Sequence, residues 1–335
     1  MSAIIPPMRI LKLLLLTLSI VFASAKPELV VYTYDSFTAP WGAAAKVKAA
    51  FEKECNCTLR FVSTPSAMQS LRKIQMEGAR SKADILLGLD TATMETARRT
   101  GLFAPHGLTL PPLELPVAFE DDTFVPYDYG YFAFVYHAKT IARPPHSLEE
   151  VAALPDHVKI VIQDPRSATP GMGLLLWVKA VYGEEAEAYW RKLAPHILSV
   201  TKSWSQAYAL FLQGEAEMVF SYTTSPAYHR YNGETTDIEA AIFPQGHYGQ
   251  IEVAAMLKRT RHPELARRFL RFLTSDTFAR IVPTTNWSYP VVTPKEGLPE
   301  VFRTLPKPSR MLLLPPQEVE AHRKTWIREW LEALR

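Results

Sequence analysis

LVVYTYDSF at residues 29–37 is an apolar run that ends in polar and aromatic side chains. Valine and tyrosine favour extended backbone, and a short apolar run of this kind is typical of a buried strand. The stretch therefore predicts a strand over residues 29–33 at the start of the folded chain, with Tyr34 and Asp35 at its polar tip.

The segments after this strand alternate between helix and strand. Apolar spacing predicts helices at 43–55 and 64–76, strands at 59–62 and 83–89, and a helix that ends at Gly101. Thr64 is expected to cap the second helix, with Pro65 at its first helical position. Strands that alternate with helices in this way predict an α/β fold with a mainly parallel sheet.

Residues 124–136 form an extended segment longer than one ordinary strand, and residues 248–257 form a second extended segment. Long segments of this kind suit crossings between two lobes. The rest of the chain is expected to add strands at 159–162 and 218–222, a helix from 148, a helix that ends before 196, and helices at 171–182, 263–273 and 316–334. We therefore predict two lobes with a hinge and a cleft between them, lobe I from residues 26–129 and 252–303 and lobe II from residues 130–251 and 304–335.

Residues 1–25 have the composition of a secretory signal peptide. Arg9 and Lys12 precede an apolar run at 13–22, and ASA at 23–25 supplies a small-residue cleavage site. The run is too short to span a bilayer, and it lacks the polar face expected of the alternative, a buried helix. The sequence thus predicts export of a soluble chain that begins at the next residue.

Charge excludes two classes of partner. The chain of 335 residues has 37 basic and 34 acidic residues, and removing Arg9 and Lys12 from the 37 leaves 35. With basic and acidic residues so nearly equal in number, the chain lacks the excess of positive charge that binding to nucleic acid or to an anionic membrane would require. Beyond the signal peptide, no apolar stretch approaches the length of a transmembrane helix.

The two cysteines, Cys55 and Cys57, stand at the end of the first predicted helix. Export permits a disulfide between them, although a loop closed across one residue gains little stability. The sequence leaves open both a disulfide and a free thiol pair. A metal site is not expected, because no histidine or second thiol pair stands nearby at ligand spacing.

Hydroxyl groups and aromatic rings gather in YTTSPAY at residues 222–228, directly after a predicted strand. In open α/β sheets the carboxyl ends of strands face the binding crevice. The segment therefore predicts ligand contacts; the alternative is a capped turn before a short helix, since Ser-Pro is a good helix start. The candidate side chains are Tyr222, Thr223, Thr224, Ser225 and Tyr228.

QDPRSATPGMG at residues 163–173 also follows a strand and opens a helix. Thr169 is expected to cap this helix, with Pro170 at its first position. The free N–H groups of a helix N-terminus attract anions such as phosphate. Anion binding and plain helix capping are both consistent with the segment, which has no nucleotide-loop spacing.

Three tryptophans, Trp41, Trp204 and Trp287, stand in polar, loop-like surroundings. Each alone could cover the core, but together with Tyr34 they suggest an aromatic box for a flat or cationic ligand. Gly-x-Ser-x-Gly and His-Glu-x-x-His are absent, and the histidines lack a matching nucleophile, so an enzyme is not expected.

The motifs above resemble the periplasmic thiamine-binding proteins of bacterial thiamine ABC transporters over essentially the whole mature chain. The matching stretches are YTYDSF at 32–37, NC at 56–57, DTFVP at 122–126, DYGYFAFVY at 128–136, QDPR at 163–166, YTTSPAYH at 222–229 and NW at 286–287. The resemblance implies a two-lobed, type II periplasmic-binding-protein fold, of the class that also holds ferric-ion and maltose binders. It also implies thiamine, thiamine monophosphate and thiamine diphosphate as transported ligands, no cofactor, and delivery to a membrane permease with its ATPase.

Carried over by motif, the resemblance implies ligand contacts from aromatic rings that stack on the aminopyrimidine and from polar groups that hold the phosphate. These residues are Tyr34, Trp41, Thr169, Trp204, Tyr222, Thr223, Thr224, Ser225, Tyr228 and Trp287. Ser66-Ala67 stands where a member of the family has an Asp-Gly pair, and Ala168 stands where that member has a serine. We expect Ser66 to reach the ligand through its hydroxyl or its backbone N–H, while affinity and preference among the phosphate forms stay open.

Two other functions fit the same fold. A thiaminase-like enzyme would need a cysteine nucleophile, and only Cys55 and Cys57 are present, away from the aromatic cluster. A binder of another small solute, ferric ion or a polyamine, is the second alternative. Iron would need tyrosines that converge with histidine or acidic ligands, which Tyr222 alone does not establish.

Overall fold

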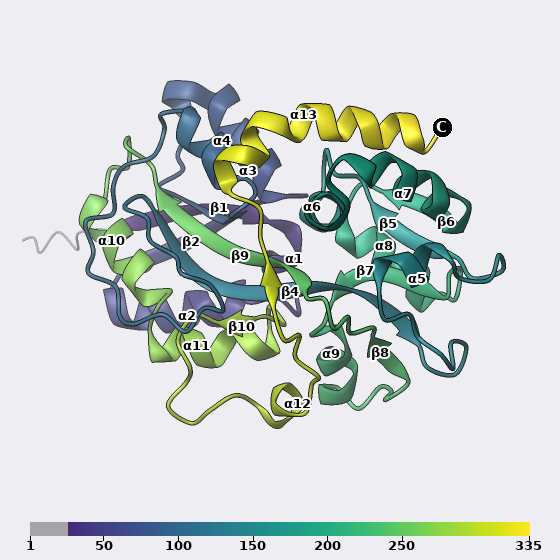
Figure 1. Cartoon of the computed structure of the whole chain (residues 1–335). Helices are drawn as coiled ribbons and strands as arrows, with labels where there is room; N and C mark the ends of the chain where they lie inside the picture. Colours follow the sequence, from purple (N-terminus) through teal and green to yellow (C-terminus); the bar gives the residue numbers. More distant parts are fainter. Residues whose placement is uncertain (1–25) are drawn as a thin grey trace, which may run out of the picture.

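The computed structural model describes residues 26–335 and shows strands surrounded by helices (Figure 1). The predicted signal peptide lies outside the described residues. Within the described part of the chain, no helix has both the length and the apolar character needed to cross a bilayer.

The sheet of lobe I has the order β2-β1-β3-β9-β4, in which the first three strands are parallel and the others antiparallel. Its strands are β1 (Glu28–Tyr34), β2 (Thr58–Thr64), β3 (Ile85–Asp90), β9 (His247–Met256), β4 (Phe124–His137) and the short β10 (Tyr289–Pro290). Its helices are α1 (Asp35–Thr38), α2 (Ala44–Cys55), α3 (Ala67–Glu77), α4 (Met94–Arg99), α10 (Pro263–Phe272), α11 (Asp276–Ile281) and α12 (Glu300–Arg303). Apolar side chains of α2 and α10 pack on one face of this sheet, and those of α3 and α4 pack on the other.

The sheet of lobe II continues from β4 in the order β4-β7-β5-β6. Its strands are β5 (Ile160–Gln163), β6 (Ile197–Thr201), β7 (Met218–Tyr222) and β8 (Ile238–Ala240), and β11 (Met311–Leu312) pairs with β9. Its helices are α5 (Leu148–Ala152), α6 (Thr169–Tyr182), α7 (Ala186–Leu193), α8 (Trp204–Leu212), α9 (Ser225–Tyr231) and α13 (Pro316–Ala333).

Strands β4 and β9 are the two crossings that the extended segments predict. β4 pairs with β9 through residues 124–131 and with β7 through residues 132–136, so one strand belongs to both sheets. Every residue of β4 except the last is buried, which explains its continuous apolar and aromatic character. The exact lobe boundaries, 129/130 and 251/252, stay a prediction.

Helix α13 spans the two lobes on the outside of the molecule (Figure 1). Its buried side chains, Val319 and Trp330, join the apolar core formed by α6 and α7 of lobe II. Its N-terminal half reaches α4 of lobe I, where the Arg323 guanidinium donates to the Thr96 hydroxyl at 2.7 Å. The C-terminal helix thus connects the lobes at a second place, apart from the two crossing strands.

Two helix starts differ from the prediction. Helix α3 begins at Ala67, and its N-cap is Ser66, whose hydroxyl accepts from the Gln69 N–H, so Thr64 does not cap it. Helix α6 has Ala168 as its N-cap, and Thr169 is its first helical residue. In both cases the observed N-cap has extended backbone. It lies two residues after the predicted cap in α3 and one residue before it in α6.

The cysteine question is resolved in favour of the disulfide. Cys55 and Cys57 are bonded to each other, with their Cα atoms 5.2 Å apart. Asn56 between them adopts a left-handed conformation at φ 51°, which allows the chain to turn so tightly at the end of α2.

Candidate functional site

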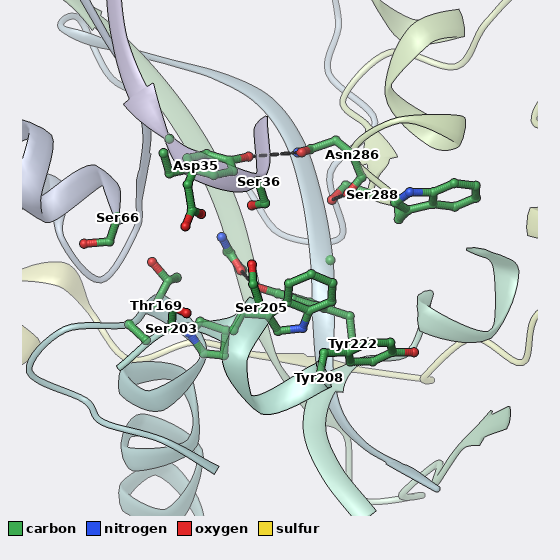
Figure 2. A pocket seen from close by; sticks show the side chains of 18 of the residues that line it. Asp35, Ser36, Ser66, Thr169, Ser203, Ser205, Tyr208, Tyr222, Asn286 and Ser288 are labelled. Carbon is green, nitrogen blue, oxygen red and sulfur yellow. Dashed lines mark hydrogen bonds between the residues drawn. The ribbon is translucent and has the colours of Figure 1, made fainter. Parts of the chain in front are cut away.

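A cavity of about 330 Å³ lies between the two lobes and is lined by both (Figure 2). Its size is that of a small-molecule site. Most of its walls come from the carboxyl ends of strands and the starts of helices: β1 into α1, the turn before α3, the turns before α6, α8 and α9, and the loop before β10. The cavity therefore lies at the carboxyl ends of the strands, where the sequence predicts the binding crevice.

The cavity brings together ten of the eleven predicted contact residues. They are Tyr34, Trp41, Ser66, Thr169, Trp204, Tyr222, Thr224, Ser225, Tyr228 and Trp287. Thr223 is not part of the lining, because it is fully buried and its N–H donates to the Tyr131 carbonyl. Ligand contact by any of the eleven stays a prediction.

Two aromatic contacts between rings that line the cavity cross from one lobe to the other. The ring of Trp41 in lobe I lies 6.3 Å from that of Trp204, which stacks on Tyr208 within α8 of lobe II. Trp287 in lobe I meets Tyr228 of α9 edge to face at 5.2 Å. The aromatic box thus consists of two pairs, each with one ring from each lobe.

The backbone at two positions is shaped to place these rings. Trp287 has φ 56°, an unusual conformation for a tryptophan and one that functional sites often hold. Gly88 of β3 has φ 101°, and a Cβ atom there would lie 2.3 Å from the Tyr34 ring. Only glycine at this position lets Tyr34 lie over the sheet and face the cavity.

One side of the cavity is built from helix N-termini. Ser66 precedes α3, Thr169 begins α6, and Ser203 precedes α8, and all three line the cavity. Figure 2 shows Thr169 and Ser203 next to each other, and the Ser167 hydroxyl ties these turns together by donating to the Lys202 carbonyl at 2.9 Å. Helix N-termini with hydroxyl side chains suit an anionic group.

The floor of the cavity carries two buried carboxylates, Asp128 of β4 and Glu252 of β9, which are directly paired across the strands. The Glu252 carboxylate accepts from the hydroxyls of Tyr34 at 2.8 Å and Tyr127 at 2.9 Å. The Asn286 amide donates to Asp128 at 2.7 Å and to Glu252 at 3.1 Å.

Burial changes the ionisation of this floor. It raises the pKa of Glu252 to about 7. Burial and the charge of Glu252 together raise the pKa of Asp128 well above its usual range. None of the side chains that line the cavity within residues 26–335 is Lys, Arg or His. The floor therefore suits a cationic group or a hydrogen-bond donor, whereas the helix N-termini of the same cavity suit an anion.

Sequence reasoning missed several lining residues, among them Asp35, Asp128, Tyr208, Gln250, Glu252 and Asn286. Asp128 and Asn286 stood in motifs that carried the resemblance but were given no role. Glu252 had a signal of its own, because it is a lone acidic residue in the otherwise apolar strand IEVAAM at 251–256. An isolated charge in a buried strand indicates a functional or paired group.

Residues 34–279 match the family model of the bacterial extracellular solute-binding proteins. The chain belongs to this family. It is 48% identical to a thiamine-binding periplasmic protein of Brucella melitensis over 97% of this chain and 99% of the relative. It is also 48% identical to one of Escherichia coli K12, over 97% and 98% of the two chains.

A solved structure described as a periplasmic thiamin binding protein superposes with a TM-score of 0.89 at 48% identity, covering 92% of this chain and 97% of the other. This similarity confirms the predicted two-lobed, type II periplasmic-binding-protein fold.

Proposed function

We propose that this protein is the periplasmic solute-binding component of an ABC importer for thiamine and its mono- and diphosphate esters. The thiamine-binding relatives, nearly half identical over almost the full length of both chains, support this assignment. In this role the protein is exported, binds its ligand in the cleft, and delivers it to a membrane permease that works with an ATPase. The ligand is cargo, and the proposal includes no cofactor.

The observation that carries the proposal is the chemical polarity of the cavity. Thiamine has a cationic thiazolium, a flat aminopyrimidine with N–H donors, and a hydroxyethyl arm that carries phosphate in its esters. The carboxylate floor at Asp128 and Glu252 complements the positive, donor-bearing part, and the helix N-termini at Thr169 and Ser203 complement the phosphate. The two pairs of rings, one on each lobe, suit a flat ring system between them.

We infer that the protein is a binder without catalytic activity. The only thiols of the chain, Cys55 and Cys57, form a disulfide and do not line the cavity. A thiaminase-like reaction needs a free nucleophile at the ligand. Incubation with thiamine and an amine acceptor is expected to leave thiamine intact; transfer of the pyrimidine to the amine would contradict this inference.

A polyamine is the second candidate ligand, because the cavity has carboxylates and aromatic rings without a basic side chain. Ferric ion has less support, since no cluster of three or more His, Cys, Asp or Glu in residues 26–335 is placed to hold a metal. Neither ligand uses the helix N-termini of the cavity.

Mass spectrometry of ligand released from gently purified protein tests the proposal directly. We expect thiamine or a phosphate ester, and isothermal titration of the stripped protein is expected to give binding of all three forms. Spermidine and ferric citrate serve as competitors in the same titration. Binding of either competitor with no binding of any thiamine form would overturn the assignment.

A further inference from the structure

Three carboxylates lie side by side across the centre of the lobe I sheet. Glu252 of β9 is paired with Asp128 of β4 on one side and with Asp90 of β3 on the other. Paired residues on neighbouring strands project from the same face of a sheet, so the three charges would be close together. All three side chains are at most 7% exposed.

The three carboxylates differ in the donors that they receive. Glu252 accepts from Tyr34, Tyr127, Asn286 and, at 3.0 Å, from the Gln250 amide. Four donors favour the ionised form of Glu252.

Asp128 receives the Asn286 amide on one oxygen, and its other oxygen, Oδ1, has no partner among the described residues. Asp128 is fully buried and lines the cavity. An unpartnered buried carboxylate oxygen is costly when charged, and this one is next to the charged Glu252. The geometry therefore favours a proton on Asp128 when the site is empty.

Within residues 26–335, no Lys, Arg or His donates a hydrogen bond to either member of the Asp128–Glu252 pair. The titratable groups that face it are Tyr34 from β1, Tyr127 on β4, Tyr222 from β7 and Asp90 from β3. Tyrosines stay neutral here, because burial raises the pKa of each. The nearby guanidinium of Arg323 faces Asp90 from α13, and the Thr93 hydroxyl also donates to Asp90 at 2.6 Å.

We propose that Asp128 selects for a positively charged, donor-bearing ligand by exchanging a proton for it, so that thiamine binding releases a proton to solvent. The proposal rests on the proposed function. Before binding, Asp128 is a neutral acid beside the Glu252 carboxylate. On binding, its proton leaves to the buffer, and the new carboxylate accepts an N–H of the aminopyrimidine or faces the positive ring. No covalent bond to the ligand forms. The Asp128–Glu252 pair goes from one negative charge to two, and the positive charge of the ligand returns the filled site to the net charge of the empty one.

The exchange makes affinity depend on pH in a defined direction. While the empty site holds the extra proton, each released proton tightens binding by up to about tenfold per unit rise in pH. Above the pKa of Asp128 in the empty protein, the dependence disappears. A neutral solute of the same size gains nothing from the exchange, because it would leave Asp128 charged and without a partner.

Calorimetric titration of the full mature chain with thiamine, in HEPES and in Tris buffer at the same pH of about 8, measures the protons released by Asp128, because Glu252, whose pKa is about 7, is then largely ionised. The two buffers have different ionisation enthalpies, so the difference between the two apparent binding enthalpies gives the number of protons directly. We expect release that approaches one proton per thiamine in the native protein and none in Asp128→Asn. Asp156→Asn, which removes an exposed carboxylate outside the cavity, is expected to keep the release.

Each outcome separates the inference from the function on which it rests. Binding of thiamine by the native protein with no proton release would overturn the inference and leave the function standing. Proton release that persists in Asp128→Asn would show that the proton comes from another group and would overturn the role proposed for Asp128. No binding of thiamine or its esters by the native protein would overturn the proposed function itself.

Difference infrared spectroscopy of the native protein supplies a readout that needs no variant, should Asp128→Asn fail to fold. The empty protein is expected to show the carbonyl stretching band of a protonated carboxylic acid, and addition of thiamine is expected to remove it. A band that is absent before thiamine is added, or that remains unchanged after it, would overturn the proton exchange.

Discussion

Tyr228 and Trp204 are the residues whose loss should affect ligand affinity most. Each ring faces the cavity and contacts a ring of the other lobe, Trp287 or Trp41. Replacement of either by alanine removes stacking of about 0.5–1.5 kcal/mol and a cation–π contribution of up to about 2 kcal/mol. We expect each variant to bind thiamine at least about tenfold more weakly by isothermal titration.

Tyr231→Ala is the matched control for Tyr228→Ala. Tyr231 belongs to the same helix, also contacts the Trp287 ring and is 53% exposed, but it does not line the cavity. We expect its loss to leave thiamine affinity nearly unchanged. Equal effects of the two substitutions would mean that the rings act by positioning Trp287 and not by contact with the ligand.

Thr169→Ala should distinguish between forms of the ligand. Thr169 is the first residue of α6 and is not the N-cap, so its hydroxyl is not used to cap this helix. If the start of α6 holds the phosphate, the substitution weakens binding of thiamine monophosphate and leaves free thiamine nearly untouched. Titration of one variant with both ligands measures this, and an equal loss for both would place the phosphate elsewhere.

At the residue scale, the sequence identified the aromatic and hydroxyl groups of the cavity more readily than its carboxylates. Tyr222 to Tyr228 are contiguous, so strand-end geometry places them at the cleft. Asp128, Glu252 and Asn286 come together only because β4 and β9 pair in one register and the loop before β10 returns to them. Such long-range pairing is not encoded by any local pattern.

At the scale of elements, hydrophobic spacing located most helices and strands, and capping details were less predictable. Thr64-Pro65 has the pattern of a helix start, but β2 continues through Thr64, and Ser66 takes the cap. Helix α8 was missed, although Ser203 followed by Gln206 has the pattern of a capping box. Strand β6 was also missed. Leu198 and Val200 lie on the exposed face of this edge strand but are apolar, so apolar and polar residues do not alternate along its sequence as they do in a typical half-buried strand.

Helix α13 allows a test of how firmly the lobes are joined outside the crossing strands. Arg323 on this helix donates to Thr96 of α4 and is the guanidinium that faces buried Asp90. Arg323→Met leaves Asp90 without a facing cation, so we expect the free energy of unfolding to fall by about 1–3 kcal/mol. Urea unfolding of the mature chain measures the change.

Arg328→Met on the same helix provides the control. Arg328 is exposed, and no ion pair of its side chain is found in residues 26–335. Its replacement should change the free energy of unfolding by no more than about 0.5 kcal/mol. A similar loss in both variants would assign the effect to the helix propensity of α13 and not to the contact with lobe I.

At the scale of the whole molecule, the ligand and the hinge share the same two strands. β4 and β9 carry the acidic floor of the cavity and also connect the lobes. Each of the two aromatic pairs joins a ring of lobe I to a ring of lobe II, so a ligand between the rings of a pair would contact both lobes at once. Ligand binding and the relative position of the two lobes are therefore coupled, because the residues that line the cavity come from distant segments of the sequence and from both lobes.

This arrangement predicts how the stability of the empty protein depends on pH. Asp128 and Glu252 have raised pKa values, so above the usual range of carboxylates the folded state binds more protons than the unfolded state, and stability falls as pH rises. Buried His247 acts in the opposite direction, because burial lowers its pKa to about 4, but that effect is complete above about pH 6.5. Between about pH 6.5 and 8, we therefore expect the free energy of unfolding to decrease, by at most about 1.4 kcal/mol per pH unit for each extra proton bound.

Urea unfolding across this range, with and without saturating thiamine, measures the slope. Asp128→Asn removes one titrating acid, so its slope should be shallower than that of the native protein. Saturating thiamine should flatten the slope of the native protein, because the filled site holds the pair ionised at every pH in the window. A native slope of zero, or one that rises with pH, would mean that the buried floor is ionised in the empty protein and is stabilised by a group that its hydrogen bonds do not include.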